Sequence, residues 1–211
     1  MTFISFEGID GCGKTTQVEL LRAHLQSAGA VVVATREPGG TALAETIRAH
    51  LLAASETVDA RAELLLFGAA RAQHTTQTIR PALARGDIVL CDRFADSSLA
   101  YQGGGLELDA DFIACMNEFA TGGLQPDITF LLDLDAAAGL QRRAVQRGQG
   151  DRIEERGLEF QRRVRDAYLQ MAQAERFVTL DAGAPAKIVH NRIVRALESR
   201  NVFQFPKAKQ T

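Results

Sequence analysis

A glycine-rich junction close to the N-terminus constrains the fold more strongly than any other feature of this sequence. The stretch FEGIDGCGKTTQ contains the pattern G-x-x-x-x-G-K-T, directly after an apolar run and before a segment with helical spacing. Glycines in this pattern let backbone N–H groups turn inward around a phosphate, and the positive end of the following helix faces the same point. We therefore predict a phosphate-binding loop made of Gly8, Ile9, Asp10, Gly11, Cys12, Gly13, Lys14, Thr15 and Thr16.

Three side chains near this loop are assigned separate tasks. Lys14 is expected to reach the β- and γ-phosphates of ATP, and the Thr15 hydroxyl is expected to ligate Mg²⁺. Asp92 ends the apolar run DIVLCD and suits a second carboxylate that organises the magnesium ion at the end of a strand. The sequence has no N-K-x-D segment for reading guanine, which argues against a GTPase switch.

Short apolar runs predict the fold class. Five of them have the length and continuity of buried parallel strands, namely FISFE, VVVATR, DIVLCDR, DITFLLDL and RFVTLD. Helical segments separate them: Leu43, Ile47 and Leu51 are expected on one helix face, and an alanine-rich helix is expected from about residue 60 to 85. This alternation predicts an α/β fold, a doubly wound five-stranded parallel sheet flanked by helices, with ligands at the carboxyl ends of the strands.

Length and charge narrow the class of protein. A chain of 211 residues fits one domain over residues 1–211, with a charged, glycine-containing stretch near 142–153 and a tail at 201–211. The net charge of −2 gives no argument for a nucleic-acid or membrane partner. Glu7 interrupts the N-terminal apolar run, so this run does not resemble a signal peptide. No stretch of about 20 apolar residues is present, so we expect no membrane-spanning helix. The three cysteines lack the spacing of metal ligands. We expect a reduced, cytoplasmic protein.

Two arginines follow predicted strands. Arg36 ends the run VVVATR, and Arg93 follows the run DIVLCD. The carboxyl ends of parallel strands meet at one edge of the sheet, so both arginines are expected beside the phosphate loop. Arginine suits this position because it grips a phosphate with two parallel hydrogen bonds. The pair predicts a second phosphate-bearing ligand next to the first.

The motifs taken together resemble those of the thymidylate kinases, which phosphorylate dTMP to dTDP with ATP. The matching segments are FEGIDGCGKTTQ, TREPGGT, LLFGAARAQH, CDRFADSSLAYQGGG and RGQGDRIE, in family order over about residues 3 to 155. The resemblance implies a P-loop nucleoside-monophosphate kinase of the bacterial type that uses Mg·ATP, serves dTTP biosynthesis and forms a homodimer.

The resemblance also implies which residues bind the acceptor. Arg36 and Arg93 would clamp the dTMP phosphate, with Arg93 and Lys14 acting in catalysis. Phe67 would stack on thymine, Arg71 would donate to a thymine carbonyl, and Tyr101 would fill the space of a ribose 2′-hydroxyl. The full set implied for the acceptor is Asp10, Arg36, Pro38, Phe67, Arg71, Arg93, Ser97, Tyr101 and Gln102. The glycines at 103 to 105 are expected to supply flexible backbone after Gln102.

Asp10 is an unexpected acid inside a phosphate-binding loop. A carboxylate about 8 Å from one phosphate charge costs on the order of 2 kcal/mol at an effective dielectric constant of 20. The resemblance implies that Asp10 instead reaches the 3′-hydroxyl of the acceptor sugar, while Lys14, Mg²⁺ and the two arginines neutralise the phosphates. Asp10 therefore predicts an acceptor nucleotide beside the loop.

The catalytic arginine is expected outside the loop. Some thymidylate kinases carry it directly after the acid, but here that position is Gly11. The stretch RRAVQRGQGDRIEER resembles the arginine-bearing lid of the bacterial enzymes, and we favour Arg147, with Arg152 next. Two alternatives stay open: a kinase for another acceptor such as dUMP, and a P-loop ATPase or regulatory protein that needs neither Arg36 nor Arg93.

Overall fold

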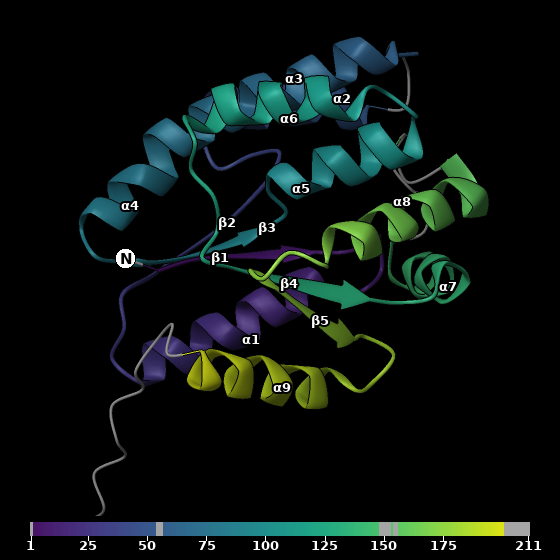
Figure 1. Ribbon diagram of the computed structural model, residues 1–211. Coiled ribbons are helices and arrows are strands. Elements are labelled where there is room, and N and C mark those ends of the chain that lie inside the picture. The colour runs from purple at the N-terminus through teal and green to yellow at the C-terminus, as the bar shows by residue number, and fades with distance from the viewer. Residues whose placement is uncertain (1, 54–56, 148–152, 154–155, 201–211) are drawn as a thin grey trace, which may run out of the picture.

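A five-stranded parallel sheet forms the centre of the molecule. The computed structural model describes residues 2–53, 57–147, 153 and 156–200. The strands lie in the order β2-β3-β1-β4-β5 (Figure 1). They are β1 (Thr2–Glu7), β2 (Val32–Arg36), β3 (Ile88–Asp92), β4 (Ile128–Asp133) and β5 (Phe177–Asp181). All five expected runs are strands, and the predicted α/β fold is confirmed.

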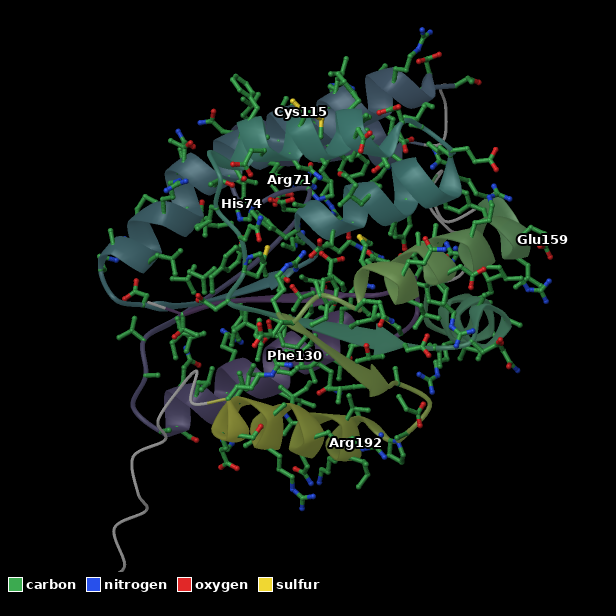
Figure 2. All side chains as sticks on the ribbon, in the orientation of Figure 1. Arg71, His74, Cys115, Phe130, Glu159 and Arg192 are labelled. Carbon is green, nitrogen blue, oxygen red and sulfur yellow. The ribbon has the colours of Figure 1, made fainter. Side chains whose placement is uncertain are left out.

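Helices cover both faces of this sheet. α1 (Lys14–Ser27) and α9 (Ala186–Ser199) lie on one face, and Figure 2 shows Phe130 between the sheet and this layer. The opposite face carries α2 (Ala42–Leu52), α3 (Ala60–His74), α4 (Arg80–Ala84), α5 (Ala95–Ser98) and α6 (Ala110–Thr121) (Figure 1). α7 (Ala136–Arg147) and α8 (Gly157–Met171) pack on each other near the carboxyl end of β4 (Figure 1).

The strand register places the predicted arginines and acids at one edge. Asp92 pairs in register with Phe6 of β1 on one side and with Arg36 of β2 on the other. The chain leaves β1 directly into the phosphate loop, so this loop begins level with Asp92 and Arg36. The topology thus brings three separate motifs to the carboxyl edge of the sheet, as parallel strands require.

Two helical segments differ from the sequence-based prediction. The segment expected as one helix from 60 to 85 is helical throughout, but π-helical residues η1 (Thr75–Ile79) interrupt it between α3 and α4. Pro81 follows this interruption, and proline removes one N–H donor from a regular α-helix. The prediction for Leu43 was wrong: Leu43 is 52% exposed, whereas Ala44, Ile47 and Leu51 are buried. Ile47 and Leu51 lie on the buried face as expected, and Ala44 takes the place predicted for Leu43.

Across residues 2–53, 57–147, 153 and 156–200, none of the helices combines the length and the apolar character needed to cross a bilayer.

Candidate active site

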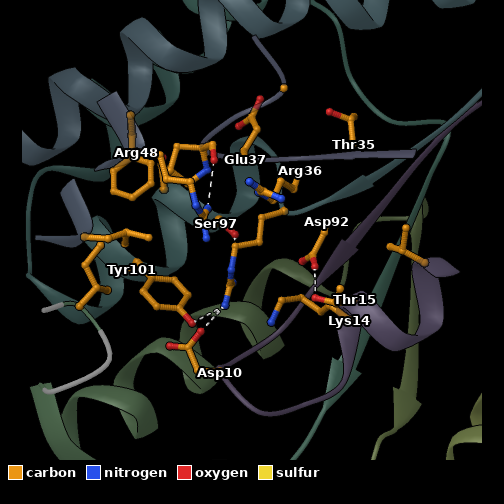
Figure 3. Close-up of a pocket in the computed structure, with 18 of the residues that line it drawn as sticks. Asp10, Lys14, Thr15, Thr35, Arg36, Glu37, Arg48, Asp92, Ser97 and Tyr101 are labelled. Atoms are coloured by element: carbon orange, nitrogen blue, oxygen red, sulfur yellow. Dashed lines mark hydrogen bonds and ion pairs between the residues drawn. The ribbon is translucent and has the colours of Figure 1, made fainter. Parts of the chain in front are cut away.

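A cavity of about 540 Å³ opens at the carboxyl edge of the sheet (Figure 3). Its volume lies in the usual range for small-molecule sites. The phosphate loop forms one side, β2 and α2 form a second, and β3, α5 and the π-helical segment η2 (Leu99–Gly105) form a third. The predicted residues that line it are Asp10, Gly11, Gly13, Lys14, Thr15, Thr16, Arg36, Pro38, Phe67, Asp92, Arg93, Ser97, Tyr101 and Gln102.

The phosphate loop has the backbone geometry that its glycines predict. Gly8 has a φ of 136°, and a Cβ atom there would lie 2.5 Å from the carbonyl oxygen of Leu132. The Lys14 ammonium group donates to the carbonyls of Gly8 and Ile9 at 3.2 and 2.9 Å. Ile9 and Cys12 are buried below the loop and do not line the cavity. Burial raises the pKa of the Cys12 thiol, which makes this side chain a packing residue rather than a nucleophile.

The two predicted magnesium ligands lie together. The Thr15 hydroxyl donates to Asp92 Oδ2 at 2.6 Å, at the mouth of the phosphate loop (Figure 3). The described residues contain no cluster of three or more His, Cys, Asp or Glu side chains that could hold a metal alone. Magnesium typically takes one or two protein oxygens and completes its shell with phosphates and water. A hydroxyl beside a carboxylate at the end of a phosphate loop fits that donor set.

Asp10 and Arg93 form an ion pair inside the cavity. The Arg93 guanidinium donates to Asp10 Oδ1 at 2.6 Å and to the Tyr101 hydroxyl at 2.8 Å, and it lies 4.7 Å from the centre of the Tyr101 ring (Figure 3). Gln161 of α8 donates to the other Asp10 oxygen at 3.0 Å. Burial alone raises the pKa of Asp10, but the charges of Arg93 and Lys14 outweigh it and the pKa lies below its usual value. Asp10 is therefore an ionised hydrogen-bond acceptor.

Glu7 supports the segment that follows Arg93, a role that was not predicted from the sequence. Its carboxylate accepts the Phe94 N–H at 2.7 Å, the Ser97 hydroxyl at 2.6 Å and the Tyr168 hydroxyl at 2.7 Å. Arg93 has a φ of 71°, in the left-handed region that non-glycine residues rarely adopt. The contacts at Phe94 and Ser97 fix the backbone that follows this strained residue. The Ser97 proton is directed to Glu7, so Ser97 supports Arg93 in addition to lining the cavity.

The β2–α2 segment forms the opposite wall. Arg36 is 54% exposed and pairs with Glu45 at 3.0 Å, and the Glu37–Pro38 peptide bond is cis. Arg48 of α2 also lines the cavity and donates to the Pro38 carbonyl at 3.0 Å. No sequence motif pointed to Arg48, because its position depends on how α2 packs against the sheet.

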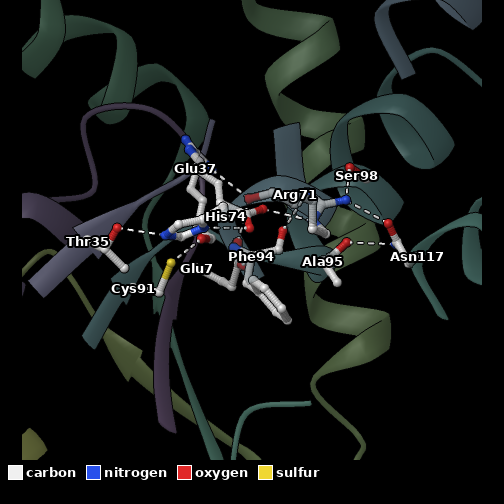
Figure 4. Close-up of polar contacts among 12 residues, drawn as sticks. Glu7, Thr35, Glu37, Arg71, His74, Cys91, Phe94, Ala95, Ser98 and Asn117 are labelled. Atoms are coloured by element: carbon white, nitrogen blue, oxygen red, sulfur yellow. Dashed lines mark hydrogen bonds and ion pairs between the residues drawn. The ribbon is translucent and has the colours of Figure 1, made fainter. Parts of the chain in front are cut away.

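Arg71 lies behind the cavity wall. It is 1% exposed and, unlike Phe67, is absent from the cavity lining. Its guanidinium donates to Glu37 at 2.8 Å, Ser98 at 3.0 Å and Asn117 at 2.6 Å, and also to the Phe94 carbonyl (Figure 4). Four of its five N–H groups are therefore engaged. Glu37 and Ser98 do line the cavity, so Arg71 orders two residues of the wall.

The glycine run after Gln102 has a packing role instead of the expected flexibility. A Cβ atom on Gly104 would lie 2.5 Å from the Ala167 Cβ atom, and one on Gly105 would collide with the Phe160 ring. η2 thus lies directly against α8, and the absence of side chains permits this approach. Tyr101 and Gln102 are held by that contact.

The side chains of the two arginines predicted in the lid fall outside the described part of the structure. Arg147 is the last residue of α7, but its side chain is outside the described residues, and so is the whole of Arg152. Of the neighbouring arginines, Arg143 lines the cavity, whereas Arg142 donates to the carbonyl of Ala182 at 2.8 Å.

Comparison with known proteins gives a consistent result. The family model described as thymidylate kinase matches residues 6–193. A thymidylate kinase of Deinococcus radiodurans is 48% identical over 94% of this chain and 97% of its own length, and one of Pseudomonas entomophila is 53% identical over 90% and 92%. The crystal structure of a thymidylate kinase from Ehrlichia chaffeensis superimposes with a TM-score of 0.76 at 36% identity, covering 93% of this chain and 98% of that one. This chain belongs to the thymidylate kinase family.

Proposed function

We propose that this protein phosphorylates dTMP to dTDP with Mg·ATP, by direct in-line transfer of the γ-phosphoryl group to an oxygen of the dTMP phosphate. The observation that carries this proposal is the Asp10–Arg93 pair at 2.6 Å, which lies beside a phosphate-binding loop in one cavity. A cation for a second phosphate and an acid for a sugar hydroxyl serve an acceptor nucleotide. Neither is needed for hydrolysis of ATP alone.

On the donor side, the loop and Lys14 would bind the phosphates of ATP. Thr15 and Asp92 would hold Mg²⁺, which neutralises charge on the transferred group. On the acceptor side, Arg36 and Arg93 would place the dTMP phosphate in line with the γ-phosphorus. Such positioning and charge neutralisation supply most of the catalysis in phosphoryl transfer. A general base is unnecessary, because a phosphate monoester with a second pKa of about 6 is already largely ionised near neutral pH.

The acceptor sugar and base would occupy the remaining cavity. Asp10 would accept a hydrogen bond from the 3′-hydroxyl, Phe67 would stack on thymine, and Tyr101 would exclude a ribose 2′-hydroxyl. Arg71 would orient Ser98 and Glu37 of the cavity wall toward the base. Its one remaining N–H group is the donor that could bond to the base directly.

A coupled assay for ADP release tests this proposal. Parallel reactions contain Mg·ATP with dTMP, dUMP, dCMP, dGMP, AMP or no acceptor. Release that requires dTMP, with slower release for dUMP, supports the proposal. Faster turnover of dUMP identifies a different acceptor, and acceptor-independent release identifies an ATPase.

We also propose that the protein acts as a homodimer of single kinase domains. An exposed apolar surface supports the dimer: Phe112 and Phe119 of α6 are 55% and 89% exposed, and Leu65 of α3 is 55% exposed. Cys115, which lies between these two phenylalanines on α6, is exposed as well (Figure 2). Exposed apolar side chains that gather on one face of a protein mark association surfaces. Light scattering of the wild type and of Phe119→Asp tests the dimer, and we expect the aspartate variant to be monomeric.

The three free cysteines fit a reducing compartment such as the cytoplasm.

A further inference from the structure

Another buried carboxylate, Glu63, lies next to the acceptor side of the cavity. The Glu63 side chain on α3 is fully buried. It accepts two hydrogen bonds from the Arg156 guanidinium, at 3.1 Å on Oε1 and 2.6 Å on Oε2. Its Oε1 atom also accepts the amide N–H of Gln102 at 2.9 Å. Residues from α3, η2 and the start of α8 therefore meet at one carboxylate.

The surroundings connect this cluster to the predicted base site. Gln102 is 1% exposed and lines the cavity, and Phe67 lies one helical turn after Glu63 on α3. The Arg156 guanidinium lies 5.0 Å from the centre of the Phe160 ring, which in turn packs edge-on against Tyr101 at 6.0 Å. The cluster thus forms the back of the wall that carries Phe67, Tyr101 and Gln102.

The chemistry of Glu63 fixes the orientation of the Gln102 amide. A buried carboxylate is retained only with a partner, and the two-pronged contact with Arg156 keeps both Glu63 oxygens as acceptors. An acceptor-only group can face only the NH₂ end of an amide. Gln102 must therefore direct its NH₂ end toward Glu63, and its carbonyl oxygen points away from that carboxylate.

We propose that Glu63 is a positioning residue for acceptor selectivity: by orienting Gln102, it makes the cavity wall a hydrogen-bond acceptor that favours bases with an imide N–H. This inference rests on the proposed function. Thymine and uracil carry an imide N–H at N3, whereas N3 of cytosine accepts a hydrogen bond. A carbonyl on the wall pairs with the first kind of base and opposes the second.

The Glu63→Gln substitution tests the inference. A glutamine at position 63 offers both a carbonyl and an NH₂ group, so the Gln102 amide is free to adopt either orientation. We expect the ratio of kcat/KM for dTMP over dCMP to fall about 10-fold or more, as for one hydrogen bond of about 1.4 kcal/mol. We expect kcat with dTMP to stay within about 3-fold of the wild type, since no group on the transferred phosphate changes.

Matched variants separate orientation from stability. Arg162→Ala removes an exposed arginine of α8 that pairs with Glu159, and it should leave the ratio unchanged. If Glu63→Gln does not fold, Arg156→Lys and Arg156→Met take its place: the lysine variant should keep the selectivity and the methionine variant should reduce it. A folded Glu63→Gln protein with an unchanged ratio, or with kcat/KM reduced equally for both nucleotides, overturns the inference.

Failure of the proposed function gives a different result. In that case the wild type itself shows no dTMP-dependent ADP release. Calorimetric binding of dTMP and dCMP to the wild type and to Glu63→Gln still reports the orientation of Gln102. Equal binding ratios in the two proteins would then overturn the inference without reference to turnover.

Discussion

Arg93 and Asp10 are 83 positions apart in the chain, yet the guanidinium donates to the carboxylate across 2.6 Å. The pair combines the two groups that we assign to the acceptor, one for its phosphate and one for its sugar. Each group also neutralises the other while the two are largely buried, with both side chains 16% exposed. Replacing either residue therefore changes both contacts to the acceptor.

Asp10→Ala should separate acceptor binding from donor binding. The variant loses the contact to the sugar hydroxyl and leaves Arg93 without its partner, so we expect the KM for dTMP to rise about 10-fold or more. The KM for ATP should stay within about 3-fold, because Lys14, Thr15 and the backbone of the loop remain. Steady-state kinetics with each substrate varied in turn measures both constants. An equal loss of affinity for both nucleotides would contradict the assignment of Asp10 to the acceptor.

The sequence was sufficient for those parts of the structure that depend on local pattern. The strands follow from apolar runs, and the phosphate loop follows from glycine spacing, since both signals lie within about ten consecutive residues. The meeting of Arg36, Asp92 and the loop follows from a topological rule about parallel strands. The sequence alone therefore predicts that these groups lie at one edge of the sheet.

Contacts between segments that are far apart in the chain could not be predicted from the sequence. Glu7 looked like an interruption of an apolar run, but it supports the Arg93 segment through Phe94, Ser97 and Tyr168. Gly104 looked like a flexible residue, but it permits close packing of α8. Both roles depend on which helix covers which part of the sheet, and a single sequence carries no local signal for that arrangement.

Glu7→Gln should change the pH dependence of stability. Burial, followed by the charge of Asp96, raises the pKa of Glu7 from 4.5 to about 7. Between these values the folded protein binds a proton that the unfolded chain has released, so the contribution is fully present below pH 4.5 and is lost as the pH rises through 7. A shift of this size corresponds to about 3 kcal/mol. A glutamine cannot titrate, and its amide can still bond to Phe94, Ser97 and Tyr168.

Urea unfolding of the wild type and of Glu7→Gln across this pH range measures the difference. The free energy of unfolding of the wild type should fall relative to that of the variant as the pH rises. Glu159→Gln, at a site on α8 with a 73% exposed side chain, serves as the control and should parallel the wild type. Parallel curves for Glu7→Gln as well would show that Glu7 does not titrate in this range.

Two arginines of the acceptor site should differ in how much they contribute to the free energy of unfolding. Arg71→Met leaves the buried Glu37 carboxylate without its guanidinium and should lower the free energy of unfolding by about 3 to 5 kcal/mol. Arg36→Ala breaks an exposed pair with Glu45 and should cost no more than about 1 kcal/mol, while raising the KM for dTMP. Chemical denaturation and steady-state kinetics on both variants test the contrast. Strong destabilisation by Arg36→Ala, or none by Arg71→Met, would contradict it.

Neighbouring glycines of η2 provide a test of packing. A Cβ atom at Gly104 would lie 2.5 Å from the Ala167 Cβ atom, whereas one at Gly103 would lie 3.4 Å from Ile113 Cδ1, an ordinary contact. We expect Gly104→Ala to destabilise the protein by about 1 to 3 kcal/mol and Gly103→Ala to stay within about 0.5 kcal/mol of the wild type. Thermal unfolding measures both. If flexibility were the reason for the glycines, the two variants would lose similar stability.

The remaining prediction concerns the arginine that stabilises the transferred phosphoryl group. Position 11 cannot supply it: Gly11 has a φ of 79°, and a Cβ atom there would collide with the Gly139 carbonyl of α7. We expect Arg147→Ala to lower kcat about 100-fold or more with little change in KM, as for an interaction made mainly in the transition state. Steady-state kinetics of Arg147→Ala, Arg152→Ala and Arg143→Ala measures kcat and KM for the three candidates under one condition. If kcat for Arg147→Ala stays within about 3-fold of the wild type, the arginine whose loss slows the transfer takes that role. The remaining candidates are Arg152, the next choice from the sequence, and Arg143, which lines the cavity.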